Sequence, residues 1–329
     1  MPEISLSAEF KEWLVGDKAP SFADVESYLD DAFSLRVDVI GESITDIYRY
    51  VEPLGRSAKE PVISWKAESE DVFCGGIDGV RRHLEAVVAS SRRISSGTAI
   101  SKVRYVQKPF YNKVFSLVEG DASVEPLEYG AGELGPITTG TDVTLVVDYG
   151  HGFIPDSEMT KRVLGTSSFL ALTVQANSYN WGFNVANKWK HDGLEVDYLV
   201  LDEAELRLNY QDSKSSIDAL TQRLAEDFNC RMVAITRGHR GCIVLERDFE
   251  HYHSGIPVVV PAVVDRALDR IGAGDAFLAT TAPLVKVGAP PNVVAVVGNV
   301  AGAIQVGTVG NSSPVTMEEL HEWLRELLR

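Results

Sequence analysis

The sequence predicts an α/β protein built on a doubly wound, mainly parallel β-sheet. Short apolar runs that are typical of buried strands alternate with helix-forming stretches from residue 36 to residue 329. Several of these strands end directly in polar residues, at the edge where open α/β sheets bind their ligands. With 329 residues, of which 45% are hydrophobic, the chain is long enough for one large domain with a small appendage.

Composition narrows the classes of partner. The formal net charge of −16 argues against a nucleic-acid surface or an anionic membrane surface, and it makes a divalent cation easy to accommodate. No apolar run reaches membrane-spanning length, and the acidic N-terminal segment does not resemble a signal peptide. The three cysteines are scattered without metal-ligand spacing, which is typical of reduced thiols. We therefore expect a cytoplasmic protein that binds neither nucleic acid nor a membrane.

Residues 1–35 predict two short amphipathic helices ahead of the main domain. Phe10, Trp13 and Leu14 share one apolar face of the first helix, and Ser21 is the expected N-cap of the second. We expect these helices to form an accessory layer without chemistry, and we assign the main domain to residues 36–329.

The first predicted strand of that domain, residues 36–41, leads into the candidate site residue Asp46. A carboxylate just past the end of a strand is placed to bind a ligand, although aspartate at such a point also stabilises turns. Residues 47–66 alternate in two pieces around a turn and predict a two-stranded flap. Gly75 and Gly76 then open a predicted helix, where two glycines allow a helix to pack closely on a strand.

Polar residues also follow the central strands. One apolar strand ends in Asp148, and a cluster of amides that includes Asn177 follows the next strand, where it forms either a ligand pocket or an ordered loop. A third strand leads into Asp202 and Glu205. Two carboxylates at a strand-to-helix turn suit a hard cation that keeps its waters, although the helix dipole favours acidic residues there in any case.

The most informative stretch is Gly272, Ala273, Gly274 and Asp275, which precedes a helix-forming run. A helix that starts there points unpaired backbone amides into the space before it, and glycine lets an anion approach closely. An anion hole beside an ionised carboxylate is what phosphoryl transfer to an alcohol requires. The alternative is that the glycines only make a turn and Asp275 only caps the helix.

Residues 269–275 resemble the second signature of the PfkB/ribokinase family of carbohydrate kinases, D-[S/T]-x-G-A-G-D, with Arg270 where the family has Ser or Thr. Two weaker matches are a T-x-G-x-x-G segment and a Gly-Gly helix start, although the asparagine that usually follows the two glycines is missing. These weaker matches fall on Thr236, Gly238, Gly241, Gly75 and Gly76. The resemblance covers about 290 residues and is most specific at residues 272–275.

This resemblance implies a ribokinase-like sugar kinase that uses ATP and Mg²⁺, with a small β lid at about residues 47–66. It implies that Asp275 is the general base and that residues 272–274 form the anion hole. Nucleotide contacts are implied for Thr236, Gly238, Gly241, Arg270 and Asn299. Sugar contacts are implied for Asp46, Gly75, Gly76, Asp148 and Asn177. Asp202 and Glu205 are implied to hold Mg²⁺ through water, and the resemblance also allows a monovalent cation and a homodimer formed through the lid.

The sequence of residues 55–62 is most similar to the heptose-7-phosphate kinase branch, the kinase domain of ADP-heptose synthases. This similarity implies a heptose 7-phosphate-like acceptor, a precursor of a surface polysaccharide. No H-x-G-H phosphate site occurs, so we expect a separate nucleotidyltransferase wherever the pathway activates the sugar. Six basic residues are candidates for binding the distal phosphate, with solvated surface charge as the alternative: Arg49, Arg56, Lys59, Arg104, Lys108 and Lys113.

Other classes of function stay open at this point. A ligand-binding pseudokinase or regulatory subunit is motivated by Arg270 and by the altered Gly-Gly helix, whereas the intact Asp275 opposes it. A kinase of an unphosphorylated sugar or of a nucleoside fits the same motifs. A Rossmann oxidoreductase lacks the G-x-G-x-x-G that should follow the first strand. Consumption of ATP with candidate sugars separates the kinases from the regulator.

Overall fold

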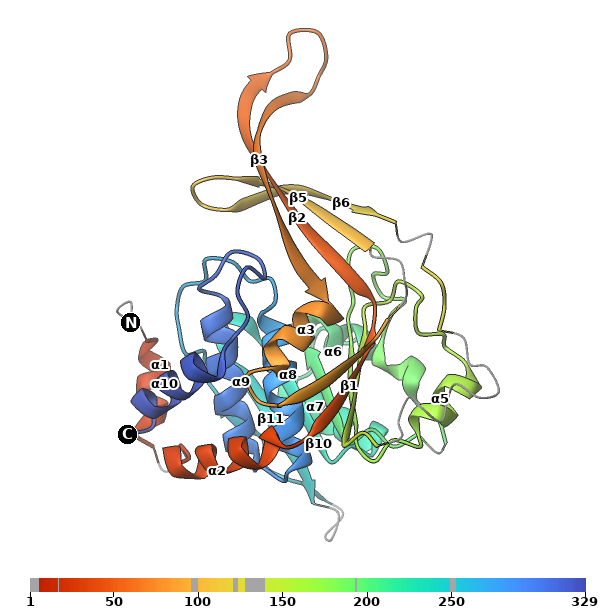
Figure 1. Cartoon of the computed structure of the whole chain (residues 1–329), viewed down its shortest axis with the longest axis vertical. Coiled ribbons are helices and arrows are strands. Elements are labelled where there is room, and N and C mark those ends of the chain that lie inside the picture. The colour runs from red at the N-terminus through yellow and green to blue at the C-terminus, as the bar shows by residue number, and fades with distance from the viewer. Residues whose placement is uncertain are drawn as a thin grey trace.

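A nine-stranded, mostly parallel sheet forms the body of the protein (Figure 1). The computed structural model describes residues 6–16, 18–95, 100–120, 124–127, 140–192, 194–248 and 253–329. The strands of this sheet are β1 (Arg36–Gly41), β4 (Ser90–Ile94), β7 (Val143–Asp148), β8 (Leu170–Val174), β9 (Tyr198–Asp202), β10 (Met232–Thr236), β11 (Cys242–Asp248), β12 (His253–Ser254) and β13 (Val258–Val260). Their order is β12-β11-β10-β9-β8-β7-β1-β4, with β13 also paired to β11. The six strands β4, β1, β7, β8, β9 and β10 run parallel, and β11 is antiparallel to its neighbours.

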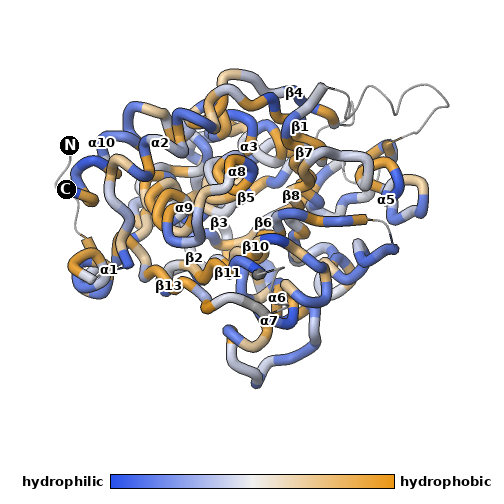
Figure 2. Tube along the Cα trace, turned by 90° about the horizontal axis from the view of Figure 1, so that it is seen from below, coloured by the Kyte–Doolittle hydropathy of each residue, from blue (hydrophilic) through white to orange (hydrophobic). Residues whose placement is uncertain are grey.

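Helices cover both faces of this sheet, which confirms the predicted doubly wound α/β topology. Alternate side chains of β1 enter different cores: Val37 and Val39 pack on one face, and Ile40 packs on the other. The first face carries α3 (Ile77–Leu84), α8 (Ala273–Lys286) and α9 (Pro291–Gln305). The second face carries α5 (Glu158–Leu164), α6 (Glu203–Tyr210) and α7 (Ile217–Phe228). Viewed from below, the apolar stretches of α8 and α9 lie in the interior (Figure 2).

The predicted accessory helices are present as α1 (Ala8–Leu14) and α2 (Phe22–Phe33), and the C-terminal helix α10 (Met317–Leu327) packs beside α2 and α9. The Ser21 side chain caps α2 by accepting a hydrogen bond from the backbone N–H of Asp24, as predicted. Apolar residues of α1 and α2, including Phe10 and Leu29, join the core of the first face. No helix in the described part of the chain is long and apolar enough to cross a membrane.

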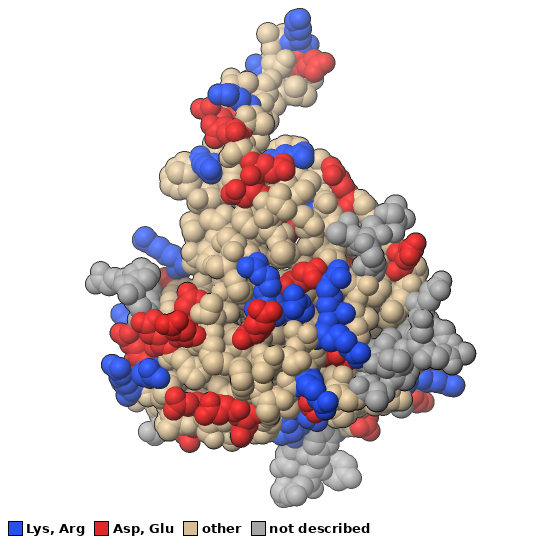
Figure 3. All heavy atoms as spheres, viewed as in Figure 1, with Lys and Arg blue, Asp and Glu red and all other residues tan. Residues whose placement is uncertain are grey.

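A second, four-stranded sheet stands away from the body (Figures 1 and 3). Its strands are β2 (Ser43–Arg56), β3 (Ile63–Gly76), β5 (Ile100–Gln107) and β6 (Asn112–Glu119), in the order β3-β2-β5-β6. We call it the projecting sheet. It is larger than the two-stranded flap expected at about residues 47–66, because β5 pairs in parallel with β2 from Ile44–Ile100 to Tyr50–Val106. The basic candidates Arg104 and Lys113 therefore belong to this sheet.

Candidate active site

A cavity of about 820 Å³ lies along the carboxyl ends of the parallel strands, between the body and the projecting sheet. The ends of β8, β9 and β10 and the start of α8 form one side, and residues of β2 and β5 form another. This volume is in the range of small-molecule sites in proteins. The cavity brings together most of the predicted site residues: Asp46, Gly76, Asp202, Glu205, Thr236, Gly238, Gly241, Arg270, Gly272, Ala273, Gly274, Asp275 and Asn299.

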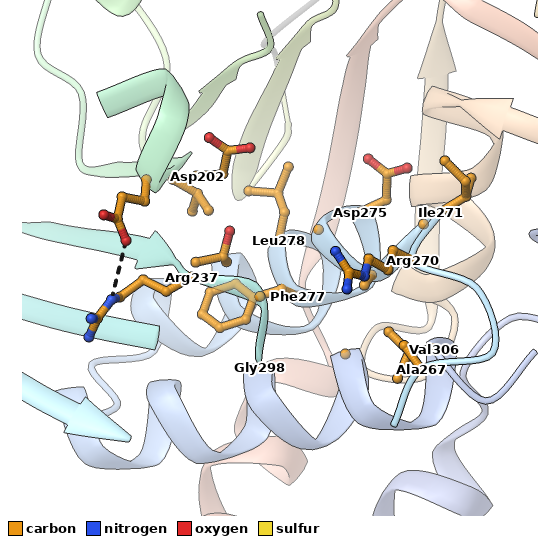
Figure 4. Close-up of a pocket in the computed structure, with 18 of the residues that line it drawn as sticks. Asp202, Arg237, Ala267, Arg270, Ile271, Asp275, Phe277, Leu278, Gly298 and Val306 are labelled. Atoms are coloured by element: carbon orange, nitrogen blue, oxygen red, sulfur yellow. Dashed lines mark ion pairs between the residues drawn. The ribbon is translucent and has the colours of Figure 1, made fainter. Parts of the chain in front are cut away.

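Helix α8 opens on this cavity with the predicted anion hole. Gly272 precedes the helix at a φ of 83°, and a Cβ there would lie 1.9 Å from the side-chain oxygen of Asn311, so only glycine fits. The first helical hydrogen bond runs from Ala276 N to Gly272 O (2.8 Å). The amides of residues 273–275 precede that bond and are free to face an anion. In Figure 4 the side chains of Asp275 and Arg270 lie together at this end of α8.

The surroundings of the Asp275 carboxyl group raise its pKa. Burial raises its pKa to about 6, and the charge of Asp46 adds to this rise. A hydrogen bond from the Tyr149 hydroxyl to Oδ1 (3.2 Å) and the charge of Lys102 act in the opposite direction. A carboxylate with a pKa of about 6 is mostly ionised at pH 7 and is more basic than a free aspartate, as a general base requires.

Asp46 and two basic residues line the part of the cavity that faces the projecting sheet. Asp46 is buried and forms an ion pair with Arg104 of β5. A Cβ at Gly75 would lie 2.3 Å from Asp46 Oδ2, so this glycine makes room for the carboxylate instead of lining the cavity itself. Lys102 lies two residues before Arg104 and therefore on the same face of β5. Burial lowers the pKa of Lys102, which the charge of Asp46 partly offsets.

Two other predicted residues, Asp148 and Asn177, lie behind the cavity wall. Asp148 is buried, accepts a hydrogen bond from the Trp189 indole (2.9 Å), and pairs with Lys188. The Asn177 amide donates to the backbone oxygen of Tyr149 (2.9 Å). Because their polar atoms already have partners within the protein, both residues support the loop that follows β7.

Sequence reasoning missed Lys102, and it also missed Glu42 and Tyr149, which support the site. Glu42 follows β1 directly, and its carboxylate accepts hydrogen bonds from the backbone amides of Tyr149 (3.1 Å), His151 (3.1 Å) and Phe153 (3.3 Å). This network fixes the loop from which the Tyr149 hydroxyl reaches Asp275. Glu42 had one available signal, its position directly past a predicted strand, and that signal was used only for Asp46.

The predicted metal ligands form a capping box at the start of α6. Asp202 Oδ1 accepts from Glu205 N (2.7 Å), and Glu205 Oε2 accepts from Asp202 N (2.8 Å). Burial, followed by the charge of Asp202, raises the pKa of Glu205 to about 8. A nearby cation would stabilise the ionised form of Glu205 and lower this pKa. The carboxylate oxygens also have further lone pairs that can accept a hydrogen bond from a water of Mg²⁺. The described residues contain no group of three or more His, Cys, Asp or Glu that could hold a metal by themselves.

Three arginines surround Glu203, the residue after Asp202 in the lining of the cavity. Glu203 pairs with Arg207 (3.1 Å), with Arg237 (3.5 Å, the dashed line in Figure 4) and with Arg240. One carboxylate thus faces three guanidinium groups, which leaves excess positive charge at the cavity. Across the cavity the predicted residue Asn299 donates from Nδ2 to the backbone oxygens of Val260 and Pro261 (3.1 Å each).

Comparison with known proteins relates part of the chain to a family of carbohydrate kinases. Residues 185–317 match the model of the pfkB family carbohydrate kinases. Among curated proteins, the chain is 23% identical over 229 residues to the bifunctional protein HldE of Pseudomonas savastanoi pv. phaseolicola, which covers 69% of this chain and 44% of that protein. The chain spans less than half the length of the curated relatives it matches.

Solved structures show the same fold. Ribokinase from Thermotoga maritima is 18% identical with a TM-score of 0.64, over 88% of this chain and 99% of that one. Arabidopsis thaliana ribokinase, solved with ribose and ATP, is 14% identical with a TM-score of 0.64, over 89% of this chain and 99% of that one. The chain therefore has a ribokinase-like fold, and its residues 185–317 are similar to the pfkB family carbohydrate kinases.

Proposed function

We propose that the protein catalyses ATP-dependent phosphoryl transfer to a hydroxyl of a sugar phosphate, a heptose 7-phosphate-like precursor of a surface polysaccharide. The observation that carries this proposal is that Asp275, the amides at the start of α8 and Asp46 open into one cavity. The family domain and the similarity to HldE support a sugar kinase and point to this branch.

In the proposed reaction the acceptor hydroxyl is held at Asp46 and attacks the γ-phosphorus of ATP. A new O–P bond forms, the bond between that phosphorus and the β–γ bridging oxygen breaks, and ADP leaves with the bond electrons. The Asp275 carboxylate takes the hydroxyl proton, and the amides of residues 273–275 stabilise the charge on the transferred group. A positioned general base is typically worth about 10²- to 10⁴-fold in rate.

Kinases of the ribokinase family generally use ATP with Mg²⁺, which neutralises charge on the nucleotide phosphates. We assign the water-mediated support of this ion to Asp202 and Glu205, because two adjacent carboxylates face the cavity beside the arginine cluster at Glu203.

Two basic residues support an acceptor that already carries a phosphate. Lys102 and Arg104 line the part of the cavity that holds Asp46. Arg49 and Lys108, two other candidates for the distal phosphate, do not line the cavity. Arg49 pairs with Glu70, and the Lys108 ammonium lies 3.8 Å from the ring centre of Tyr50. The acceptor phosphate is therefore assigned to Lys102 and Arg104.

We also propose that the projecting sheet forms a homodimer contact. It exposes several large apolar side chains, which lie on three of its strands and at the β5–β6 turn: Leu54, Ile63, Val72, Phe110, Phe115 and Leu117. Extensive exposed apolar surface often marks a contact with another protein. Sedimentation equilibrium tests this contact, and a monomer at micromolar concentration would contradict it.

The kinase proposal is tested by measuring ADP release with a panel of sugars, sugar phosphates and nucleosides. We expect Mg²⁺-dependent turnover that is fastest with a heptose 7-phosphate or a related aldose phosphate. Binding of a sugar phosphate without any consumption of ATP would replace the kinase by a ligand-binding regulator.

A further inference from the structure

A buried carboxylate, Asp269, joins the projecting sheet to the loop that precedes α8. Its side chain is 1% exposed and accepts hydrogen bonds from the backbone amides of Ile271 (3.2 Å) and Gly310 (3.0 Å). It also accepts from the Tyr48 hydroxyl and from the Lys113 ammonium. Tyr48 belongs to β2 and Lys113 to β6, so two strands of the projecting sheet meet at one carboxylate of the body.

The charges in this cluster are complementary. A buried carboxylate is stable as an anion only where nearby donors or cations replace its water. Burial raises the pKa of Asp269, but the bonds from Lys113, Tyr48 and Gly310 outweigh burial and lower it below the ordinary value. Of these donors only Lys113 carries a formal charge, so its amine is the counter-cation of Asp269.

The same cluster determines the backbone that leads into the anion hole. Ile271, whose amide Asp269 holds, directly precedes Gly272 and packs against the apolar cluster of Tyr48 and Tyr50. A Cβ at Gly310 would lie 2.7 Å from the Phe73 ring of β3, so the loop beyond α9 also fits closely against the sheet. The conformation of residues 270–272 therefore depends on how the projecting sheet packs against the body.

We propose that Lys113 is a positioning residue for phosphoryl transfer, a built-in cation that acts through Asp269. Its amine keeps Asp269 ionised and in place, and Asp269 holds Ile271 so that the amides of residues 273–275 face the transferred phosphoryl group. The projecting sheet thus completes the phosphate site as well as the sugar pocket. This inference rests on the proposed kinase activity.

The test compares Lys113→Ala with Lys108→Ala. Lys108 lies in the turn between β5 and β6, close to Lys113 in the sequence, but its ammonium lies over the Tyr50 ring and does not pair with Asp269. We expect Lys113→Ala to lower kcat at least tenfold with the KM of each substrate changed by less than about threefold, whereas Lys108→Ala stays near wild type. Lys113→Arg keeps a cation and should retain most of the kcat.

Chemical rescue separates the charge from packing. At constant ionic strength, ammonium or methylammonium should restore several-fold of the kcat of Lys113→Ala, tetramethylammonium should not, and the wild-type protein should not respond to ammonium or K⁺. Thermal melting checks that each variant is folded. If the alanine variant does not fold, Lys113→Gln, which keeps much of the chain length, takes its place.

The outcomes distinguish this inference from the kinase proposal. A wild-type protein without sugar-dependent turnover overturns both. Active wild-type protein together with equal kcat in the Lys113 and Lys108 variants overturns only the role of Lys113. A loss of kcat that ammonium does not restore assigns Lys113 to packing and overturns its role as a cation.

Discussion

Asp275, the proposed general base, illustrates a conflict between stability and the proposed function at a single residue. Its pKa is about 6 in the folded protein against an ordinary 3.8, so the fold binds this proton more tightly than the unfolded chain does. The protonated group therefore favours the fold fully below about pH 3.8, and this contribution is lost as the pH rises through 6. At pH 7 the ionised group destabilises the free protein, which is the expected cost of holding a base in a buried site.

Asp275→Asn is therefore expected to be both more stable and nearly inactive. We expect the free energy of unfolding at pH 7 to rise by about 1–3 kcal/mol, since each pKa unit corresponds to about 1.4 kcal/mol. We expect kcat to fall by about 10²- to 10⁴-fold because the proton acceptor is lost. Urea unfolding at pH 7 and pH 4 and steady-state kinetics check both effects; turnover within about tenfold of wild type would remove Asp275 from the role of base.

The pH dependence of activity should reflect the pKa of Asp275 and the hydrogen bond that its carboxylate accepts from Tyr149. Activity should fall as the pH drops through about 6, where Asp275 becomes protonated. Removing the Tyr149 hydroxyl removes a bond that lowers this pKa, so Tyr149→Phe should move the acid limb of kcat/KM to higher pH. Tyr210→Phe, which loses a comparable bond to the exposed Asp227, is the matched control. An unshifted acid limb in Tyr149→Phe would contradict the assignment of Asp275.

At the scale of elements, two capping boxes allow the metal role of α6 to be tested without loss of the helix. Gln can replace Glu at the third helical position of such a box and still bond the cap. Glu205→Gln should therefore preserve α6 but remove the carboxylate that a bound Mg²⁺ would keep ionised, and so raise the Mg²⁺ concentration needed for half-maximal rate. Glu319→Gln makes the same change in the box of α10, formed by Thr316 and Glu319, and should leave the Mg²⁺ dependence unchanged. Equal Mg²⁺ dependence in both variants would reduce Asp202 and Glu205 to helix caps.

Local elements were predictable from the sequence because their signals are local. Apolar runs predicted β7 to β10, and Gly272 with the run after it predicted the start of α8. Pairing between β2 and β5 was not predictable, because it joins residues 44–50 to residues 100–106, and no local pattern encodes that register. For the same reason no local pattern indicates that Lys102 lines the cavity.

Most residues that line the site could be predicted from the sequence, but the residues that hold them in place could not. Motif residues that line the cavity have a distinctive sequence context, as Asp275 has. Glu42 and Tyr149 act through backbone amides and a single hydroxyl, and nothing in their neighbours announces this. Asp148 and Asn177 share the composition of site residues, but the structure places them in the supporting layer.

At the scale of the whole molecule, the distribution of charge determines where an anionic substrate would be attracted. The net charge of −16 repels ATP and any sugar phosphate at long range. The cavity differs from the molecule, because its lining includes seven Lys and Arg against six Asp and Glu. Anionic substrates are therefore attracted only close to the site, where low exposure weakens screening by salt.

This contrast predicts a selective effect of Lys102 on phosphorylated acceptors. A charge-assisted hydrogen bond contributes about 1.5–3 kcal/mol, so Lys102→Ala should raise KM for a sugar phosphate by about 10- to 100-fold. KM for the corresponding unphosphorylated sugar should change by less than about threefold, since no anion is lost from its contacts. Lys59→Ala, at an exposed residue between β2 and β3, is the control for net charge and should change neither value. If the wild-type enzyme prefers the unphosphorylated sugar, or if Lys102→Ala raises both KM values equally, the acceptor phosphate does not bind at Lys102 and a plain sugar or nucleoside becomes the substrate.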